Sequence, residues 1–184
     1  DVDPGRGLAA VRTLEALGVA VSVADCVGSG RAPLSQGMID TARDRAEAVA
    51  DALDPYVEAG YDVVAVEPSD LAMLRSDYER LLPADRADRL ADASYEVMEY
   101  VYGCLENGAD PDRLAAPGEP IAYHSHCQQR TLGLDVYTEA VFDVLGCDVV
   151  TSETECCGMA GSFGYKSEYY ELSMDVGQQL KGQF

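Results

Sequence analysis

The sequence predicts an α/β protein built from two related units, with parallel strands flanked by helices and with cysteines on loops at the carboxyl ends of strands. Two observations lead to this fold class. Helix-like and strand-like segments alternate along the chain, and one pattern of helix, turn, β-rich run and cysteine-bearing loop occurs twice. With 184 residues and 47% apolar content, the chain can bury one or two hydrophobic cores.

The first unit, residues 1–107, begins with a helical spacing of apolar residues at 6–17, which Gly18 ends. A β-branched run at 19–23 follows and predicts a buried strand. An alanine-rich stretch predicts a helix over 38–57, and residues 62–66 form the next expected strand. We expect two further helices within the acidic stretch 69–105, broken near Pro83.

Proline and glycine residues at 108–120 indicate a linker to the second unit, residues 121–184. The second unit is expected to repeat the alternation. Its predicted elements are a strand at 121–124, a helix at 131–145, a strand at 148–152, a glycine-rich loop at 155–165 and a helix at 167–180.

The repeat is clearest when residues 14–30 are aligned with residues 142–161, with a two-residue gap after the strand-like run. The alignment pairs Gly18 with Gly146, Cys26 with Cys156, Val27 with Cys157 and Gly28 with Gly158. It also places a counterpart of Cys127 before residue 1 and a counterpart of residues 67–70 beyond residue 184. We therefore expect the chain to be a piece of a longer protein.

The chain is strongly acidic, with 33 acidic against 13 basic residues and a formal net charge of −20. This charge repels phosphate backbones and excludes nucleic acid as a partner. Only Lys166 and Lys181 are lysines, and an acidic surface with arginine preferred over lysine is typical of proteins from a high-salt cytoplasm. No secretory signal or membrane-spanning run is evident, so we expect a cytoplasmic protein that reaches a membrane only through a partner.

Three of the six cysteines lie where strands are expected to end. Cys127 follows one predicted strand, and the adjacent Cys156 and Cys157 follow another. If the strands are parallel neighbours, all three thiols reach the same rim of the sheet, where thiolates can bind a soft metal or a cluster. Gly158 would let the backbone approach closely, and the N-terminus of the helix near Ser167 would favour thiolate.

The cysteines and histidines also have structural interpretations. A pair of buried small side chains is the alternative for the adjacent cysteines, but the glycine-rich loop around them is poor core material. Cys104 and Cys147 lie in apolar contexts and are expected to be buried small hydrophobic residues. His124 and His126 are either a ligand or partners of the ligating sulfurs, or they are structural residues that cap a strand end.

The runs HSHCQQRTLG and ECCGMAGSFGYKSEYYELSMDVG, with the earlier RAPLSQGMID and VEPSD, resemble the cysteine-rich CCG domains. These occur in one of the subunits of heterodisulfide reductase and in iron–sulfur subunits of anaerobic glycerol-3-phosphate, D-lactate and glycolate dehydrogenases. The resemblance covers nearly the whole chain and extends to large fused archaeal proteins with a flavin dehydrogenase and a ferredoxin-like segment. It implies a piece of a halophilic archaeal FAD-linked oxidoreductase.

The resemblance implies that Cys127, Cys156 and Cys157 bind an iron–sulfur cluster, expected to be [4Fe-4S], or zinc as in some members. It further implies electron transfer from a flavin-containing dehydrogenase to a quinone or another carrier. The first unit departs from the family pattern because Val27 and Asp70 replace two cysteines, so its site is expected to be lost. The second unit lacks the later ligands within the chain, so a cluster can be absent from this piece.

Two other functions stay open. In the first, the module reduces a disulfide as heterodisulfide reductase does, although that activity uses two cluster sites. In the second, the same thiolates bind zinc and the module is structural.

Overall fold

Two small parallel sheets organise the computed structural model, which describes residues 4–184. In the first sheet, β1 (Val63–Ala65) pairs with β2 (Ser94–Glu96), and in the second β3 (Ile121–Tyr123) pairs with β4 (Val149–Thr151). The helices α1 (Pro4–Ala16), α2 (Arg31–Ser35) and α3 (Ile39–Glu58) precede β1. The α/β class predicted from the sequence is confirmed, with both strand pairs parallel.

Most of the helices follow the first strand. Between β1 and β2 come α4 (Pro68–Arg75), the 3-10 turn η1 (Asp77–Arg80) and α5 (Ala84–Asp92), and α6 (Val97–Glu106) leads from β2 to the turn η2 (Pro111–Arg113). Helices α7 (Cys127–Thr131) and α8 (Asp135–Val144) separate β3 from β4. After β4 follow η3 (Phe163–Tyr165), η4 (Ser167–Tyr169) and α9 (Tyr170–Lys181).

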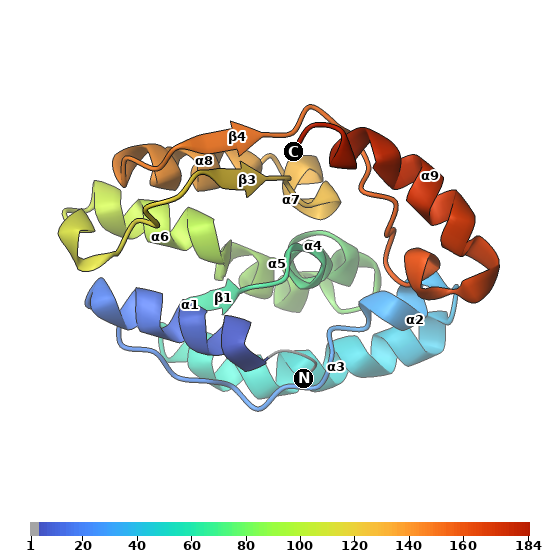
Figure 1. The fold of residues 1–184 in the computed structure, drawn as a ribbon. Coiled ribbons are helices and arrows are strands. Elements are labelled where there is room, and N and C mark those ends of the chain that lie inside the picture. Colours follow the sequence, from blue (N-terminus) through green and yellow to red (C-terminus); the bar gives the residue numbers. More distant parts are fainter. Residues whose placement is uncertain (1–3) are drawn as a thin grey trace.

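Two hydrophobic clusters hold these elements together. The first lies between α3, α4 and α5, where α3 presents buried residues at helical spacing: Ala42, Ala46, Val49, Ala50 and Leu53. The second joins α1, α6 and α8 through Leu14, Val101 and Val141. In Figure 1 the β3–β4 sheet with α8 lies on one side of α6, and α1 lies on the other. The second cluster therefore connects the two halves of the chain.

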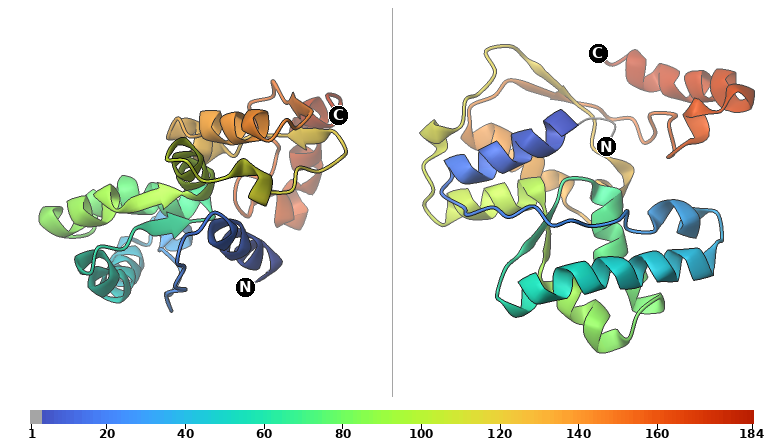
Figure 2. Two further views of the ribbon diagram at one scale, coloured as in Figure 1. Left: turned by 90° about the vertical axis from the view of Figure 1, so that its left-hand side faces the viewer. Right: turned by 90° about the horizontal axis from the view of Figure 1, so that it is seen from below.

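The strand expected at 19–23 does not form. These residues run as an extended segment along a cleft of about 820 Å³ between α1 and β1, and the side chain of Val23 is 77% exposed. Figure 2 shows this segment, in blue, passing beside the first sheet without joining it. Because β4 forms at the corresponding place in the second unit, the predicted repeat is not confirmed by the fold.

The expectation of two helices within 69–105 was wrong, because this stretch contains α4, α5 and α6, with β2 between α5 and α6. Glu96 begins α6 with a capping box: its carboxylate accepts from the backbone N–H of Glu99, and the Glu99 side chain accepts from the N–H of Glu96. This cap ends the preceding extended stretch, which pairs with β1. The predicted helix at 131–145 begins later, as α8 at Asp135, because α7 ends at Thr131 and Gly133 follows with positive φ.

Candidate functional site

The candidate site lies where β3 and β4 end side by side. Tyr123 and Thr151 are paired across the sheet, so the chain leaves both strands at the same rim, as expected from the sequence. Cys127 is exposed as the first residue of α7, and Cys156 and Cys157 are half-buried in the loop after β4. All three are free thiols.

Arg130 connects the two cysteine-bearing segments. From α7, its guanidinium donates to the carbonyl of Thr154 at 3.0 Å and to the carbonyl of Glu155. The same guanidinium lies 4.0 Å from the sulfur of Cys127. One side chain therefore ties the first turn of α7 to the backbone that enters the Cys156–Cys157 pair. Sequence reasoning missed Arg130, and its only available signal was a position three residues after Cys127, one helical turn away.

The backbone after the cysteine pair is fixed by glycine. Gly158 has φ 87°, and a Cβ there would lie 2.2 Å from the carbonyl oxygen of Ser173 in α9. The Ser173 hydroxyl donates to the carbonyl of Gly158 at 2.8 Å, and Gly177 lies against the carbonyl of Cys157. The predicted close approach at Gly158 is thus present. In α9 it is Ser173, in the first turn, and Gly177, one turn later, that contact the loop.

The two histidines point to different partners. The Nδ1 of His124 lies 2.5 Å from the hydroxyl of Ser152, at the end of β4. His126 caps α7, accepting from the backbone N–H of Gln128, and its Nε2 lies 3.6 Å from Glu67, the N-cap of α4. His126 thus joins the second half of the chain to the first, while His124 joins the two strands.

Burial, with smaller contributions from Arg130 and His126, lowers the pKa of His124 below its ordinary value of 6.5. Unfolding would release this restraint, so the unfolded chain gains a proton first as the pH falls. We therefore expect the contribution of His124 to the free energy of unfolding to be complete above pH 6.5 and to be lost progressively below it. Ring titration by NMR should give a pKa below 6.5, and His124→Gln should flatten the decrease in stability between pH 7.5 and 5.5. A ring pKa above 6.5 would contradict the expectation.

In the first unit, the residues at the positions of the family's ligands form hydrogen bonds within the protein. Asp70 accepts from the hydroxyl of Ser29 at 2.5 Å, and the fully buried Tyr78 donates to the carbonyl of Ser29 at 2.9 Å. Cys26 is exposed nearby, where partial burial and then Asp25 raise the pKa of its thiol. Asp70, which stands where the resemblance expects a cysteine, holds the glycine loop in place through Ser29.

The thiol groups at this rim are suitable ligands for a soft metal, but their arrangement does not form a complete metal site. Thiols suit iron–sulfur clusters and zinc. The Nε2 of His124 and the hydroxyl of Thr154 are buried beside the rim without a hydrogen-bond partner among residues 4–184. Across that same range, no three His, Cys, Asp or Glu side chains converge as they would around a metal ion. Within residues 4–184, Cys127, Cys156 and Cys157 therefore do not form a complete ligand set.

The other two cysteines are half-buried. Cys104 packs at the edge of the second hydrophobic cluster, where burial raises the pKa of its thiol. Cys147 follows α8, and its backbone N–H donates to the carbonyl of Phe142. The expectation of buried small hydrophobic residues is thus met only in part, because neither side chain is fully buried. Among the helices of the described chain, none combines the length and the apolar character needed to cross a membrane.

The fold and the thiol-bearing rim define an α/β module whose curated relatives are dehydrogenases or components of dehydrogenases. The chain is 26% identical to one subunit of the anaerobic glycerol-3-phosphate dehydrogenase of Escherichia coli K12 over 180 residues, 96% of this chain and 45% of that protein. It is 24% identical to D-2-hydroxyglutarate dehydrogenase of Pantoea ananatis over 171 residues, 90% of this chain and 16% of that protein.

The D-2-hydroxyglutarate dehydrogenase of E. coli K12 is 25% identical over the same length. The chain thus spans less than half the length of these relatives. No protein-family model matches the chain, and no solved structure matches it. The similarities support a dehydrogenase-associated module.

Proposed function

We propose that this chain is the electron-transfer module of a FAD-linked dehydrogenase, with Cys127, Cys156 and Cys157 as ligands of an iron–sulfur cluster. The observation that carries the proposal is the link through Arg130, which holds Cys127 beside the loop of the other two thiols. The relatives are named as dehydrogenases or as part of one, and the CCG motif resembles iron–sulfur subunits of such enzymes.

In this proposal the cluster supplies one-electron transfer when bound, and the chain supplies its position and surroundings. The carbonyls of Thr154 and Glu155 are already occupied by Arg130, so the loop backbone is restrained before any ligand binds. The N–H of Gly158 lies 3.4 Å from the sulfur of Cys156 and would stabilise a thiolate there. The Arg130 guanidinium would do the same for Cys127.

The proposed partners follow from the same resemblance. A flavin-containing dehydrogenase, with a ferredoxin-like segment, would deliver electrons from a 2-hydroxy acid or glycerol 3-phosphate, and a quinone or another carrier would accept them. Substrate chemistry would lie outside this chain. The protein would work in the cytoplasm and reach the membrane surface only through its partner.

The proposal is tested by anaerobic reconstitution with iron and sulfide, using the protein expressed from its complete reading frame. We expect visible absorption and an EPR signal on reduction, with both lost in Cys127→Ser, Cys156→Ser and Cys157→Ser. Cys147→Ser is the matched control and should retain the cluster, since its thiol lies away from the rim after α8. Stoichiometric zinc without iron would instead support the structural alternative. An unchanged cluster in Cys156→Ser would overturn the ligand assignment.

A further inference from the structure

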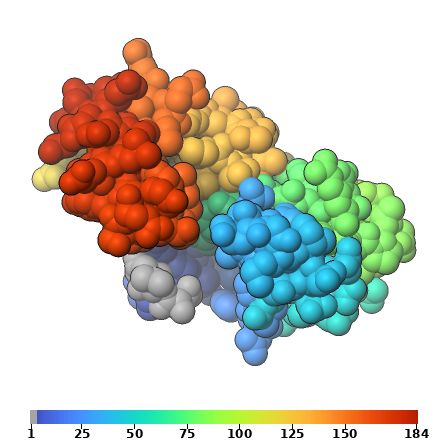
Figure 3. All heavy atoms as spheres, turned by 90° about the vertical axis from the view of Figure 1, so that its right-hand side faces the viewer, coloured from blue at the N-terminus to red at the C-terminus, as the bar shows by residue number. Residues whose placement is uncertain are grey.

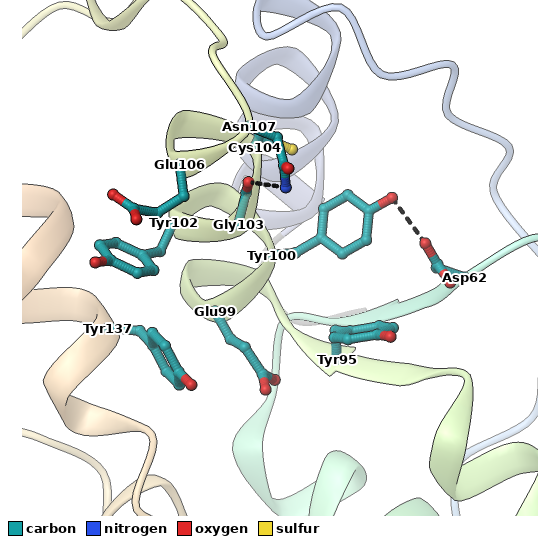
Figure 4. Close-up of a pocket in the computed structure, with 10 residues that line it drawn as sticks. All are labelled: Asp62, Tyr95, Glu99, Tyr100, Tyr102, Gly103, Cys104, Glu106, Asn107 and Tyr137. Carbon is teal, nitrogen blue, oxygen red and sulfur yellow. Dashed lines mark hydrogen bonds between the residues drawn. The ribbon is translucent and has the colours of Figure 1, made fainter.

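Besides the cleft between α1 and β1, a second hollow lies along α6, and it contains none of the three candidate ligand cysteines. It has a volume of about 550 Å³ and opens to solvent. Figure 4 shows its main residues around the helix. Aromatic rings and carboxylates line the hollow, which we call the α6 groove, and the residues that matter here are Tyr95, Tyr100, Tyr102, Tyr137, Glu99 and Glu106. Gly103 lines it without a side chain, and a Cβ there would meet no atom within 4 Å.

The tyrosines form two pairs. Tyr102 and Tyr137, from α6 and α8, have ring centroids 5.5 Å apart, and Tyr95 and Tyr100 have centroids 5.6 Å apart. All four rings are half-buried, so each keeps part of its surface exposed. The faces of aromatic rings attract cations, and they do so most strongly where water is partly excluded. A groove with four such rings and acidic neighbours favours a positively charged group.

One wall of the groove already binds such a group from within the chain. The guanidinium carbon of Arg75 lies 5.7 Å from the centroid of the Tyr95 ring, and the same guanidinium pairs with Glu99 at 2.9 Å. Tyr95 from β2 and Glu99 from α6 therefore recognise a guanidinium together beside this helix. On the other wall, Tyr102, Tyr137 and Glu106 offer the same combination without an arginine.

The Glu106 side chain is exposed and makes no ion pair or hydrogen bond with residues 4–184. It is the last residue of α6, and the last turn of that helix contains no basic residue. The carbonyl end of a helix carries partial negative charge, so a carboxylate at this position is locally unfavourable. A cation bound there would satisfy both the carboxylate and the helix end.

Asp62 adds negative charge from β1's side of the groove, where it accepts a hydrogen bond from the hydroxyl of Tyr100 at 3.0 Å. Burial, reinforced by Asp62, raises the pKa of Tyr100 to about 12, so this hydroxyl stays protonated and keeps donating at neutral pH. The chain as a whole has a net charge of −20, which attracts basic partners over longer distances.

We propose that the α6 groove binds the guanidinium of an arginine side chain on a partner protein, against the ring of Tyr102 or Tyr137 and beside Glu106. Arginine fits better than lysine because its planar group stacks on a tyrosine ring while pairing with a carboxylate. The groove uses none of the three cysteines, so binding there is independent of the proposed cluster and can be measured on iron-free protein.

The test uses the 184-residue chain with ring-labelled tyrosine and NMR titration of acetyl-Gly-Arg-Gly-amide. We expect the Tyr102 and Tyr137 signals to shift, and the matched citrulline peptide, which is neutral, to leave them unchanged. Glu106→Gln and Tyr137→Leu should each weaken binding about fivefold. Glu171→Gln, an exposed charge change in α9, controls for the overall charge and should have no effect.

Several results would overturn the proposal. Equal binding of the citrulline peptide would exclude guanidinium recognition, and an effect of Glu171→Gln equal to that of Glu106→Gln would reduce it to general attraction by an acidic protein. Glu106→Gln alters an exposed side chain, so it decides the matter even if Tyr137→Leu unfolds the protein.

Discussion

Replacing Gly158 by alanine is expected to destabilise the protein by about 3 kcal/mol or more. The new Cβ would lie 2.2 Å from the carbonyl oxygen of Ser173, which belongs to the backbone of α9 and cannot turn aside. Alanine at φ 87° is also strained. Figure 3 shows the C-terminal segment, in orange and red, as a lobe beside α2 and α3, and the glycine contact is what seats α9 on the loop within it. Urea unfolding would measure the loss.

Gly161→Ala provides the matched control. Gly161 lies in the same loop with φ 66°, but a Cβ there would meet no atom within 4 Å. It therefore carries the backbone strain without the collision, and we expect a cost of about 1 kcal/mol. Equal losses in the two variants would show that α9 does not hold the cysteine loop as described.

Removing the guanidinium of Arg130 is expected to cause the second largest loss of stability. Arg130→Met keeps an apolar stem but leaves the carbonyls of Thr154 and Glu155 without their charged donor. Hydrogen bonds to charged groups contribute about 1.5–3 kcal/mol each, so we expect a loss of about 2 kcal/mol in the free energy of unfolding. The loop that carries Cys156 should also separate from α7, which a faster reaction of its thiol with a bulky maleimide would report.

Arg43→Met is the control, because within residues 4–184 the Arg43 side chain pairs only with the exposed Asp40, three residues away in the same helix. Such surface pairs contribute little, so its stability should change by less than about 0.5 kcal/mol. If Arg130→Met lowered the free energy of unfolding no more than Arg43→Met, and the thiol reactivity were unchanged, the contacts of Arg130 would not stabilise the loop against α7.

Local patterns in the sequence were sufficient to predict the helices and strands in which apolar side chains recur regularly. The alanine-rich stretch that became α3 repeats its apolar side chains at helical spacing, and the strand-like runs ending at Tyr123 and Thr151 are short, apolar and followed by cysteine-bearing loops. Parallel neighbouring strands then bring their carboxyl ends to one edge, so the common end of β3 and β4 followed from the order of elements.

Pairing between distant segments could not be predicted in the same way. The run 19–23 has strand propensity but forms no strand, because a strand exists only where a neighbouring edge offers hydrogen bonds. Ser94–Glu96 has no such run, yet it pairs with β1, since the cap of α6 holds it extended there. Strand propensity describes how well a side chain fits in a sheet, and it does not specify which other strand will pair with it.

The sequence by itself determined the α/β class and the parallel strands that end in cysteine-bearing loops, because these depend on local periodicity and on the order of elements along the chain. Only the tertiary structure decided that Arg130 joins Cys127 to the cysteine loop, that Asp70 bonds Ser29, and that α9 presents its side to Gly158. These contacts join residues that are up to 41 positions apart. Their partners are chosen by packing in three dimensions, which no local pattern records.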